Sequence, residues 1–279
     1  GQQKNHFPED AGKEANLKKT SLLMRGPQAR MAGRKPGRTI ANAPSSLFVR
    51  EGRELFQGAA MTLAGLVTAG GLATRMGGEP LTVDKALLRP WGAAGPSLLE
   101  RAHGELARLA SPVWVACRAG RSYAEYACVT DAFPDCGPMG GIEAGLAAAA
   151  AKGRTALLVL ACDMPFMTAP LLRRLTAARE AWTARHGGAP LMTAFTQRGS
   201  RYFQSLSAVY DVAALPLLRD CLRAGRLGLY AATPPERRCL VEYGEEEAVF
   251  FFNVNTPEDA AAAGRMGRVA PEGLTLSDP

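Results

Sequence analysis

The sequence predicts an α/β fold built around a mostly parallel β-sheet. Its 279 residues are 47% hydrophobic and 21% charged, which is the composition of an ordinary globular chain. From residue 61 onward, short apolar runs of strand length alternate with segments of helical periodicity. The run "TALLVLACD" at 155–163 is apolar until its last residue, as expected of a strand that helices cover on both faces. These observations favour parallel strands joined by helical crossovers.

Six segments are expected to form the strands of this sheet. Each is a short run rich in apolar residues, and the first begins directly after Met61. In chain order they comprise residues 63–69, 111–118, 155–163, 190–195, 203–210 and 237–243.

Four further segments are expected to form helices, at residues 97–109, 140–151, 168–180 and 215–225. The first carries Leu and Ala at helical spacing, and the second is rich in alanine. Thr168 suits the N-cap of the third helix and Pro170 its first turn. Gly225 would end the fourth helix.

The basic charge of the chain is concentrated in its first 60 residues. The formal net charge is +7, and residues 1–60 carry 11 Lys and Arg against 5 Asp and Glu. Gly, Pro and basic residues without periodicity predict a disordered leader at 1–60, before a body at 61–265 and a flexible tail at 266–279. The alternatives are a basic arm that touches nucleic acid or a membrane surface, and a protein that begins at Met61. A nucleic-acid-binding domain would carry such charge on its fold, so nucleic acid is not an expected partner.

The sequence pattern disfavours a membrane-spanning protein, a secreted protein and a zinc-binding protein. No apolar run approaches the roughly 20 residues of a membrane span, and the opening residues lack the apolar region of a secretory signal. The six cysteines form no C-x-x-C pair and the histidines are scattered, so no zinc site is expected. We expect free thiols in a reducing cytoplasm.

In a parallel α/β sheet, ligands bind beyond the carboxyl ends of the strands, and three loops of this chain would lie there. The loop at 69–85, "AGGLATRMGGEPLTVDK", has glycines that leave backbone N–H groups free to face phosphate oxygens. It has neither the Walker A nor the dinucleotide-binding spacing of glycines. Arg75 and Lys85 would add two cations, which suits a triphosphate, and a structural turn is the alternative.

The other two loops supply carboxylates. The apolar strand before Asp163 would deliver this residue to the edge of the sheet, where an ionised group should meet a ligand or a metal. Mg²⁺ prefers one or two carboxylates together with phosphate oxygens, so Asp163 is a candidate metal ligand, and capping of the next turn is the alternative. Asp131 and Asp135, in the loop at 130–141, are candidates to bond a base or ribose, or belong to an ordinary turn.

Four motifs in order resemble one enzyme family. "TAGGLATRMGG…DKALL", "DAFPDCGPMGGIEAGL", "LACDMPFM" and "FFNVNTPEDAAAA" are similar to the motifs of the molybdenum cofactor guanylyltransferases. They span residues 61 to about 263, essentially the whole body. The resemblance implies a Rossmann-like three-layer sandwich of the nucleotide-diphospho-sugar transferase type.

The resemblance also implies an activity and its residues. The family transfers GMP from GTP to the molybdenum or tungsten molybdopterin cofactor, with Mg²⁺ as the enzyme's cofactor and pyrophosphate as the leaving group. Molybdoenzyme chaperones and cofactor-biosynthesis proteins are further implied partners. Arg75, Lys85 and Asp163 are implied to be catalytic, with Asp163 holding the metal. The implied nucleotide-binding residues are Thr68, Ala69, Gly70, Gly71, Lys85, Asp131 and Asp163.

A later polar turn and the closing motif are candidates to contact the pterin. They contribute Arg198, Arg201, Gln204, Asn253 and Asn255, although the two asparagines have the alternative of tying their own turn.

The chain departs from the family pattern in three places. Five residues, 79–83, stand where the family usually has one, Cys117 replaces a common Asn, and Thr68 replaces a Leu. The alternative activities are CMP transfer from CTP to the same pterin and nucleotidyl transfer to a sugar phosphate.

Overall fold

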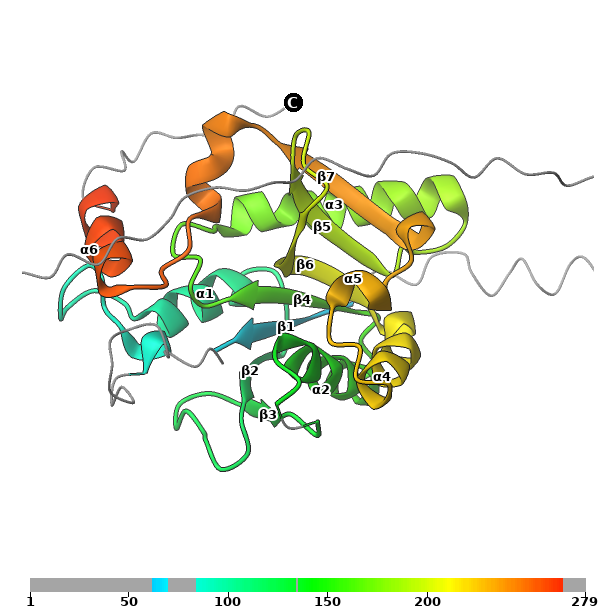
Figure 1. Cartoon of the computed structure of the whole chain (residues 1–279), viewed down its shortest axis with the longest axis horizontal. Coiled ribbons are helices and arrows are strands. Elements are labelled where there is room, and N and C mark those ends of the chain that lie inside the picture. The colour runs from blue at the N-terminus through cyan, green and yellow to red at the C-terminus, as the bar shows by residue number, and fades with distance from the viewer. Residues whose placement is uncertain (1–61, 70–83, 134, 268–279) are drawn as a thin grey trace, which may run out of the picture. The chain divides into compact units, whose positions relative to one another are not determined.

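The computed structural model describes residues 62–69, 84–133 and 135–267, and these form a seven-stranded sheet with helices on both faces (Figure 1). The strands are β1 Leu63–Thr68, β2 Val113–Cys117, β3 Cys128–Thr130, β4 Ala156–Ala161, β5 Met192–Gln197, β6 Phe203–Asp211 and β7 Arg238–Tyr243. Their order across the sheet is β3-β2-β1-β4-β6-β5-β7. Every neighbouring pair is parallel except the two that involve β6, which runs antiparallel to β4 and β5. The predicted mostly parallel sheet is confirmed.

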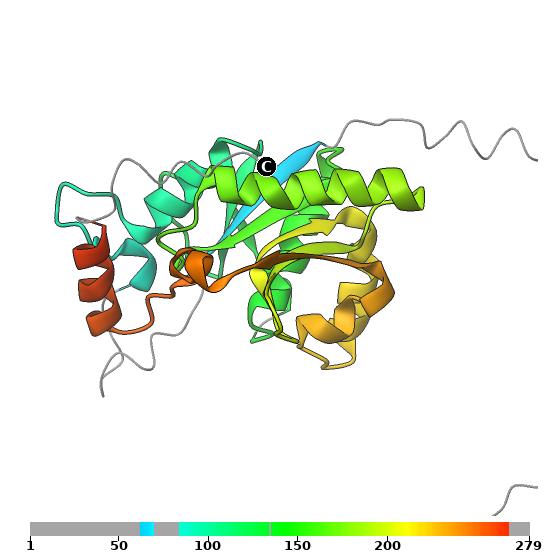
Figure 2. The same cartoon turned by 90° about the horizontal axis from the view of Figure 1, so that it is seen from above.

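Four helices lie in two layers, one on each face of the sheet (Figure 2). Helices α1 and α3 pack on one face, and α2 and α4 pack on the other. The described helices are α1 Leu98–Ala107, α2 Pro138–Ala151, α3 Ala169–His186, α4 Leu215–Arg223, α5 Leu229–Ala232 and α6 Pro257–Met266. Short 3-10 helices are η2 Lys85–Leu87, η3 Val212–Ala214, η4 Pro235–Arg237 and η5 Glu245–Phe251. The arrangement is the three-layer sandwich that the sequence led us to expect.

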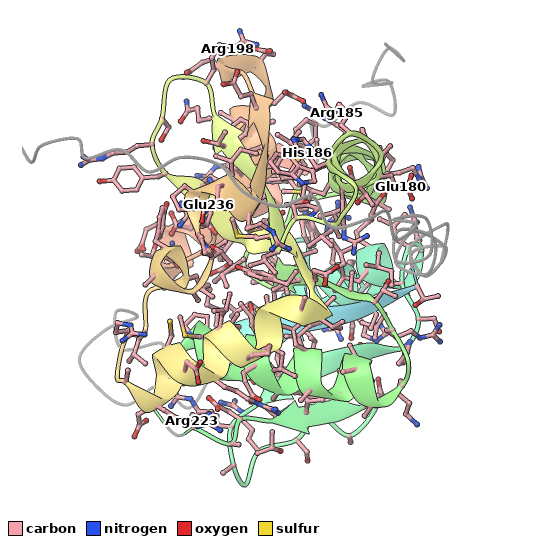
Figure 3. The ribbon with its side chains drawn as sticks, turned by 90° about the vertical axis from the view of Figure 1, so that its right-hand side faces the viewer. Glu180, Arg185, His186, Arg198, Arg223 and Glu236 are labelled. Carbon is pink, nitrogen blue, oxygen red and sulfur yellow. The ribbon has the colours of Figure 1, made fainter. Side chains whose placement is uncertain are left out.

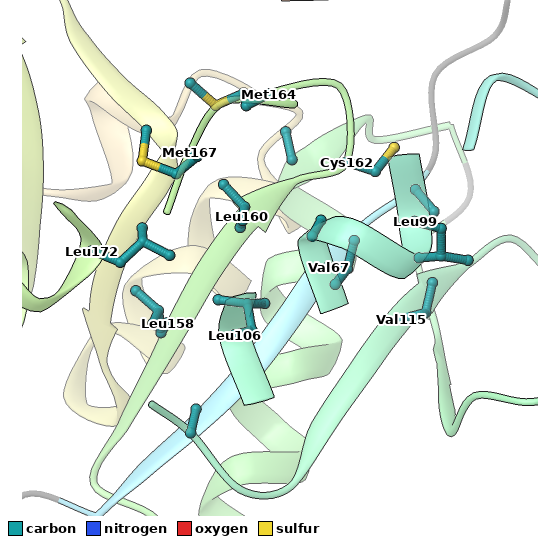
Figure 4. Packing of buried hydrophobic residues seen from close by; sticks show 14 of the residues in the cluster. Val67, Leu99, Leu106, Val115, Leu158, Leu160, Cys162, Met164, Met167 and Leu172 are labelled. Atoms are coloured by element: carbon teal, nitrogen blue, oxygen red, sulfur yellow. The ribbon is translucent and has the colours of Figure 1, made fainter. Parts of the chain in front are cut away.

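Strands β1 and β4 form the centre of the core. They pair in register from Leu63 with Ala156 to Thr68 with Ala161, and β4 is buried along its whole length. Alternate side chains of β4 enter the two apolar layers, so Leu158 and Leu160 face α1 and α3 (Figure 4). Burying each such leucine stabilises the fold by about 1.5–3 kcal/mol. The apolar run seen in the sequence therefore reflects burial on both faces.

Helix starts follow recognisable capping chemistry. Ser97 and Glu100 form a capping box at α1, and Thr256 and Asp259 form another at α6. Thr168 is the N-cap of α3 as predicted, but its side chain makes no capping bond. There the Glu105 carboxylate of α1 accepts from the Ala169 N–H at 2.7 Å, and this bond also fastens the two helices together.

Among the described strands and α-helices, three were not predicted: β3, α5 and α6. β3 has only three residues, too few for a readable alternation. Helix α6 was readable, since Thr256, Pro257 and Asp259 are an N-cap, an N1 proline and a capping-box acid in sequence order. Among the described residues, no helix is long and apolar enough to cross a membrane. The predicted leader and most of the predicted tail lie outside the described residues.

Candidate active site

Three of the predicted site residues meet beyond the carboxyl end of β4. Asp163 is the second residue after this strand, Lys85 opens η2, and Asn255 lies two residues before α6. The Lys85 ammonium donates to Asp163 Oδ2 at 2.8 Å and to Asn255 Oδ1 at 3.0 Å. The fold thus brings together residues that lie 78 and 170 positions apart in the chain.

This group is partly shielded from water. The side chains of Lys85 and Asp163 are 14% and 24% exposed, so their attraction is screened less than that of a surface pair. The Asp163 carbonyl also accepts from the Val254 N–H at 2.9 Å. This backbone bond attaches the closing motif to the end of β4 and keeps Asn255 within reach of Lys85.

A pocket of about 250 Å³ opens at the carboxyl ends of β1 and β2, and β1 is the neighbour of β4 in the sheet. Thr68 lines it, and the Thr68 carbonyl accepts from the Cys162 N–H, so the pocket adjoins the loop that carries Asp163. The pocket is lined by Thr68, Ala116, Cys117, Arg118, Ala119, Asp131, Asp135, Gly137, Pro138 and Gly141. The sequence had singled out Thr68, Asp131 and Asp135, but not Arg118 or Ala119.

Asp131 is held at the start of α2. Its Oδ1 accepts from the Phe133 N–H at 2.6 Å. Burial raises the pKa of this carboxyl, although the bond from Phe133 acts in the opposite direction. Gly140 leaves the room: a Cβ at that position would lie 2.0 Å from Asp131 Oδ2. Gly140 of "GPMGG" therefore allows a carboxylate to lie against the first turn of the helix.

The predicted nucleotide loop is described only at its ends. Thr68 closes β1, Ala69 follows it in a buried position, and Lys85 lies at the far end. Gly70, Gly71 and Arg75 lie outside the described residues, as does the inserted segment 79–83.

The candidate pterin contacts divide into separate places. Arg198 is exposed at the edge of the sheet near Glu242 (Figure 3), and the Arg201 guanidinium lies over the Tyr202 ring. Among the described residues, neither arginine bonds to Lys85 or Asp163.

The remaining candidates, Gln204, Asn253 and Asn255, each make a hydrogen bond through the side-chain amide. Gln204 Nε2 donates to the Tyr243 hydroxyl at 3.1 Å. Asn253 Nδ2 donates to the Phe251 carbonyl at 3.1 Å, so this asparagine ties its own turn. Asn255 uses its side chain to reach Lys85 instead. The two asparagines, which the sequence treated alike, therefore differ.

Asp84 was not singled out in the sequence, although it stands directly before Lys85. Its Oδ2 accepts from the Tyr123 hydroxyl at 2.8 Å and lies 2.6 Å from Arg121 Nη2. Tyr123 and Arg121 belong to the connection between β2 and β3. No local pattern links these residues to Asp84, since the contact spans 39 positions of the chain.

The donor set suits a cation that brings phosphate ligands with it. Among the described residues, no group of three or more His, Cys, Asp and Glu side chains could hold a metal. Asp163 and Asn255 instead offer a small set of oxygen atoms at one point. Mg²⁺ characteristically binds one or two protein carboxylates and completes its shell with water and substrate phosphate, so this arrangement fits it.

Cys117 and His103 have reactive side chains, but their contacts are those of residues that support the fold. Cys117 Sγ lies 2.6 Å from Cys128 Sγ, and all six cysteines are free. Burial and the contact with Cys128 raise the pKa of Cys117 to about 12, which leaves a neutral thiol at the pocket wall. Burial lowers the pKa of His103, whose ring packs edge-on against Tyr126.

Comparisons with known proteins agree on one family. The family model described as the MobA-like NTP transferase domain matches residues 65–233. The chain is 34% identical over 209 residues to a probable molybdenum cofactor guanylyltransferase of Chloroflexus aggregans, covering 71% of this chain and 92% of that protein. It is 32% identical over 219 residues to a molybdenum cofactor guanylyltransferase of Cereibacter sphaeroides, covering 75% of this chain and 98% of that protein.

Solved structures share the fold. Molybdopterin-guanine dinucleotide biosynthesis protein A from Archaeoglobus fulgidus superposes with a TM-score of 0.53 at 21% identity, covering 74% of this chain and 99% of that one. The 2-C-methyl-D-erythritol 4-phosphate cytidylyltransferase from Thermus thermophilus superposes with a TM-score of 0.51 at 19% identity, covering 75% and 100%. Such identities support the nucleotidyltransferase fold alone.

Proposed function

This chain belongs to the molybdenum cofactor guanylyltransferase family, and we propose that it transfers GMP from GTP to the molybdopterin cofactor in a Mg²⁺-dependent reaction. The observation that carries the proposal is the meeting of Lys85 and Asp163 beside the pocket that Thr68 and Asp131 line. A cation, a carboxylate and a pocket at one sheet edge are the parts that nucleotidyl transfer needs.

In the proposed reaction, a terminal phosphate oxygen of the pterin cofactor attacks the α-phosphorus of GTP. The bond from that phosphorus to the bridging oxygen of the β-phosphate breaks, and pyrophosphate leaves. The attacking phosphate is already an anion, so no residue has to remove a proton. The protein contributes positioning and neutralisation of charge.

Each residue has a place in this scheme. The Lys85 ammonium balances the charge of the triphosphate, and Asp131 bonds the guanosine in the pocket. Thr68 and Ala69 present the start of the nucleotide loop. Asp163, together with the Asn255 amide oxygen, would hold Mg²⁺, which neutralises phosphate charge when bound. Arg75 is proposed to face the triphosphate from the part of the loop that the structure does not describe.

The proposed setting is the cytoplasm, where six free cysteines stay reduced. Proposed contacts of the pterin come from Arg198, Arg201 and Gln204, with Asn253 as a weaker candidate because its amide is engaged in its own turn. Product transfer to molybdoenzymes or their chaperones completes the proposal.

A direct assay separates this activity from its relatives. The protein is incubated with molybdopterin cofactor, Mg²⁺ and either GTP or CTP, and pyrophosphate and the dinucleotide product are measured. We expect GTP to be consumed, only with the pterin present, and chelation of Mg²⁺ to stop the reaction. Faster use of CTP would assign the chain to cytidylyl transfer. Turnover with a sugar phosphate in place of the pterin would contradict the proposed acceptor.

A further inference from the structure

Asp84 is bonded more extensively than a cap requires. Its Oδ1 accepts from the Ala86 N–H at 3.0 Å, and its carbonyl accepts from the Leu87 N–H, which together start η2. Oδ2 is not needed for that turn, yet it bonds the Tyr123 hydroxyl and pairs with Arg121. The Asp84 side chain is only 10% exposed, so its bonds to the Ala86 N–H and the Tyr123 hydroxyl are shielded from bulk water, whereas Arg121 is half exposed.

We propose that Tyr123 and Arg121 are positioning residues for the transfer reaction, acting through Asp84 on Lys85. Three donors fix the Asp84 carboxylate, and the peptide that joins Asp84 to Lys85 is fixed with it. The backbone of Lys85 is thereby fixed at the position from which its side chain extends to Asp163 and Asn255. This inference rests on the proposed role of Lys85 in binding the phosphates of GTP.

Tyr123 is suited to the task because it stays a donor. Its side chain is buried, and burial followed by the Asp84 carboxylate raises the pKa of the phenol above its ordinary value. A protonated hydroxyl facing a carboxylate gives a charge-assisted hydrogen bond, here of 2.8 Å. The bond therefore persists across the whole neutral range of pH.

The same connection also reaches the pocket. Arg118 and Ala119 line the pocket, and the Arg121 N–H donates to the Arg118 carbonyl at 3.0 Å. Residues 118–123 thus run from the pocket wall to Asp84 in one short stretch. We infer that they hold the nucleoside pocket and the phosphate-binding lysine at a constant separation, as transfer at the α-phosphorus requires.

A structural support would stabilise the fold without acting on Lys85, and a double-mutant cycle distinguishes the two roles. Four full-length proteins are compared: the parent, Tyr123→Phe, Lys85→Ala and the double variant. Calorimetry gives the GTP affinity, and steady-state kinetics give kcat and the KM for GTP and for the pterin. Tyr126→Phe is the matched control, because its hydroxyl makes no hydrogen bond with another described residue.

We expect Tyr123→Phe to lower kcat/KM for GTP about tenfold, as loss of a hydrogen bond to a charged group does, and to leave the KM for the pterin unchanged. In the Lys85→Ala background the same change should have no further effect. Tyr126→Phe should match the parent. Arg121→Met removes the other partner of Asp84 from a half-exposed site and should lower kcat/KM in the same direction.

Other results overturn the inference. A full tenfold loss from Tyr123→Phe in the Lys85→Ala background would mean that the tyrosine acts independently of the lysine. Parent-like kinetics in Tyr123→Phe would mean that the bond to Asp84 has no bearing on the reaction. Unchanged GTP affinity in Lys85→Ala would instead refute the proposed role of Lys85, and this inference with it. If circular dichroism shows that Tyr123→Phe does not fold, the same cycle with Arg121→Met decides.

Discussion

Asp163 is the residue on which the proposed chemistry most depends. Its carboxylate pairs with Lys85, and its carbonyl bonds Val254, so side chain and backbone serve different purposes. The backbone bond attaches the closing motif, whereas the carboxylate faces the site. A change confined to the charge of the side chain should therefore separate catalysis from folding.

Asp163→Asn keeps the shape of the side chain and removes its charge. We expect Mg²⁺-dependent turnover to fall at least about a hundredfold, because neutralisation of phosphate charge is a major part of such catalysis. The circular dichroism spectrum should stay that of the parent. The matched control is Asp220→Asn, which alters an exposed ion pair with Arg223 and should leave turnover unchanged. Near-normal turnover in Asp163→Asn would refute the metal assignment.

A second prediction concerns Asp131 and the dependence of stability on pH. Burial raises the pKa of this carboxyl in the folded protein, so folding favours its protonated form. At neutral pH the carboxyl is charged, and its burial lowers the free energy of unfolding. This cost disappears as the pH falls below the ordinary carboxyl pKa near 4, because the group is then protonated in both the folded and the unfolded protein. Asp131→Asn keeps the acceptor for Phe133 and should melt at or slightly above the parent temperature at pH 7. The gain should be below about 1 kcal/mol, because Asp131 is partly open to water.

Thermal melts between pH 7 and pH 3 test this sign. The difference between variant and parent should shrink as the pH falls. GTP affinity should drop in the variant at pH 7, because the charged carboxylate is lost from the pocket. A variant that becomes relatively more stable as the pH falls would contradict the argument.

At the scale of elements, the start of α2 matters most. Gly137 begins it with a φ of 61°, a conformation that glycine adopts readily, and Pro138 occupies its first turn. Gly140 then leaves space for the Asp131 carboxylate. The composition of this helix start is thus dictated by the pocket rather than by helix propensity, which disfavours glycine.

Gly140→Ala should disturb the pocket without unfolding the helix. Its new Cβ would lie 2.0 Å from Asp131 Oδ2, so the carboxylate has to rotate away. We expect GTP affinity to fall as far as it does in Asp131→Asn. Gly104→Ala in α1 is the control: its Cβ meets nothing within 4 Å, and alanine there should stabilise the fold by about 0.5–1 kcal/mol. Equal GTP affinities in the two alanine variants would contradict this account.

The direction of β6 is also decided at this scale. The five-residue connection between β5 and β6 is too short for a parallel crossover, so the strands form a hairpin. The predicted strands at 190–195 and 203–210 are close enough in sequence to imply this turn. The prediction of a mostly parallel sheet did not identify them as an antiparallel pair. β6 then pairs antiparallel with β4, on the side of β4 that β1 does not occupy.

At the scale of the whole molecule, charge and chemistry are separated along the chain. Residues 1–60 carry 11 of the 33 Lys and Arg, whereas the site residues all lie in the body. Phosphate binding by the body is proposed to depend on a few placed cations rather than on a general positive field.

Removal of residues 1–60 should therefore leave guanylyl transfer intact. The truncated protein and the full chain are compared in the same GTP assay, and their kcat and KM values should agree. DNA binding by the full chain, measured at two salt concentrations, is the control for the basic arm. Salt-sensitive DNA binding that disappears with the leader, together with lost transfer, would contradict the division proposed here.

Sequence alone determined the parts with a local physical signature. The strands at 63–69 and 155–163 were readable because burial on both faces demands continuous apolar residues. Asp163 was readable because a charge at the carboxyl end of such a strand is costly without a partner, and Lys85 because it is a cation at the end of a glycine-rich loop. The helices were readable from spacing and caps, and family motifs supplied the activity.

Only the tertiary structure decided which of these parts meet. The contacts of Lys85 with Asp163 and Asn255, and of Asp84 with Tyr123, join residues 39 to 170 positions apart. Nor could the sequence tell Asn253, which ties its own turn, from Asn255, which reaches the lysine. Such pairings depend on strand order and on the path of the connections, because local propensity and periodicity act over a few residues only.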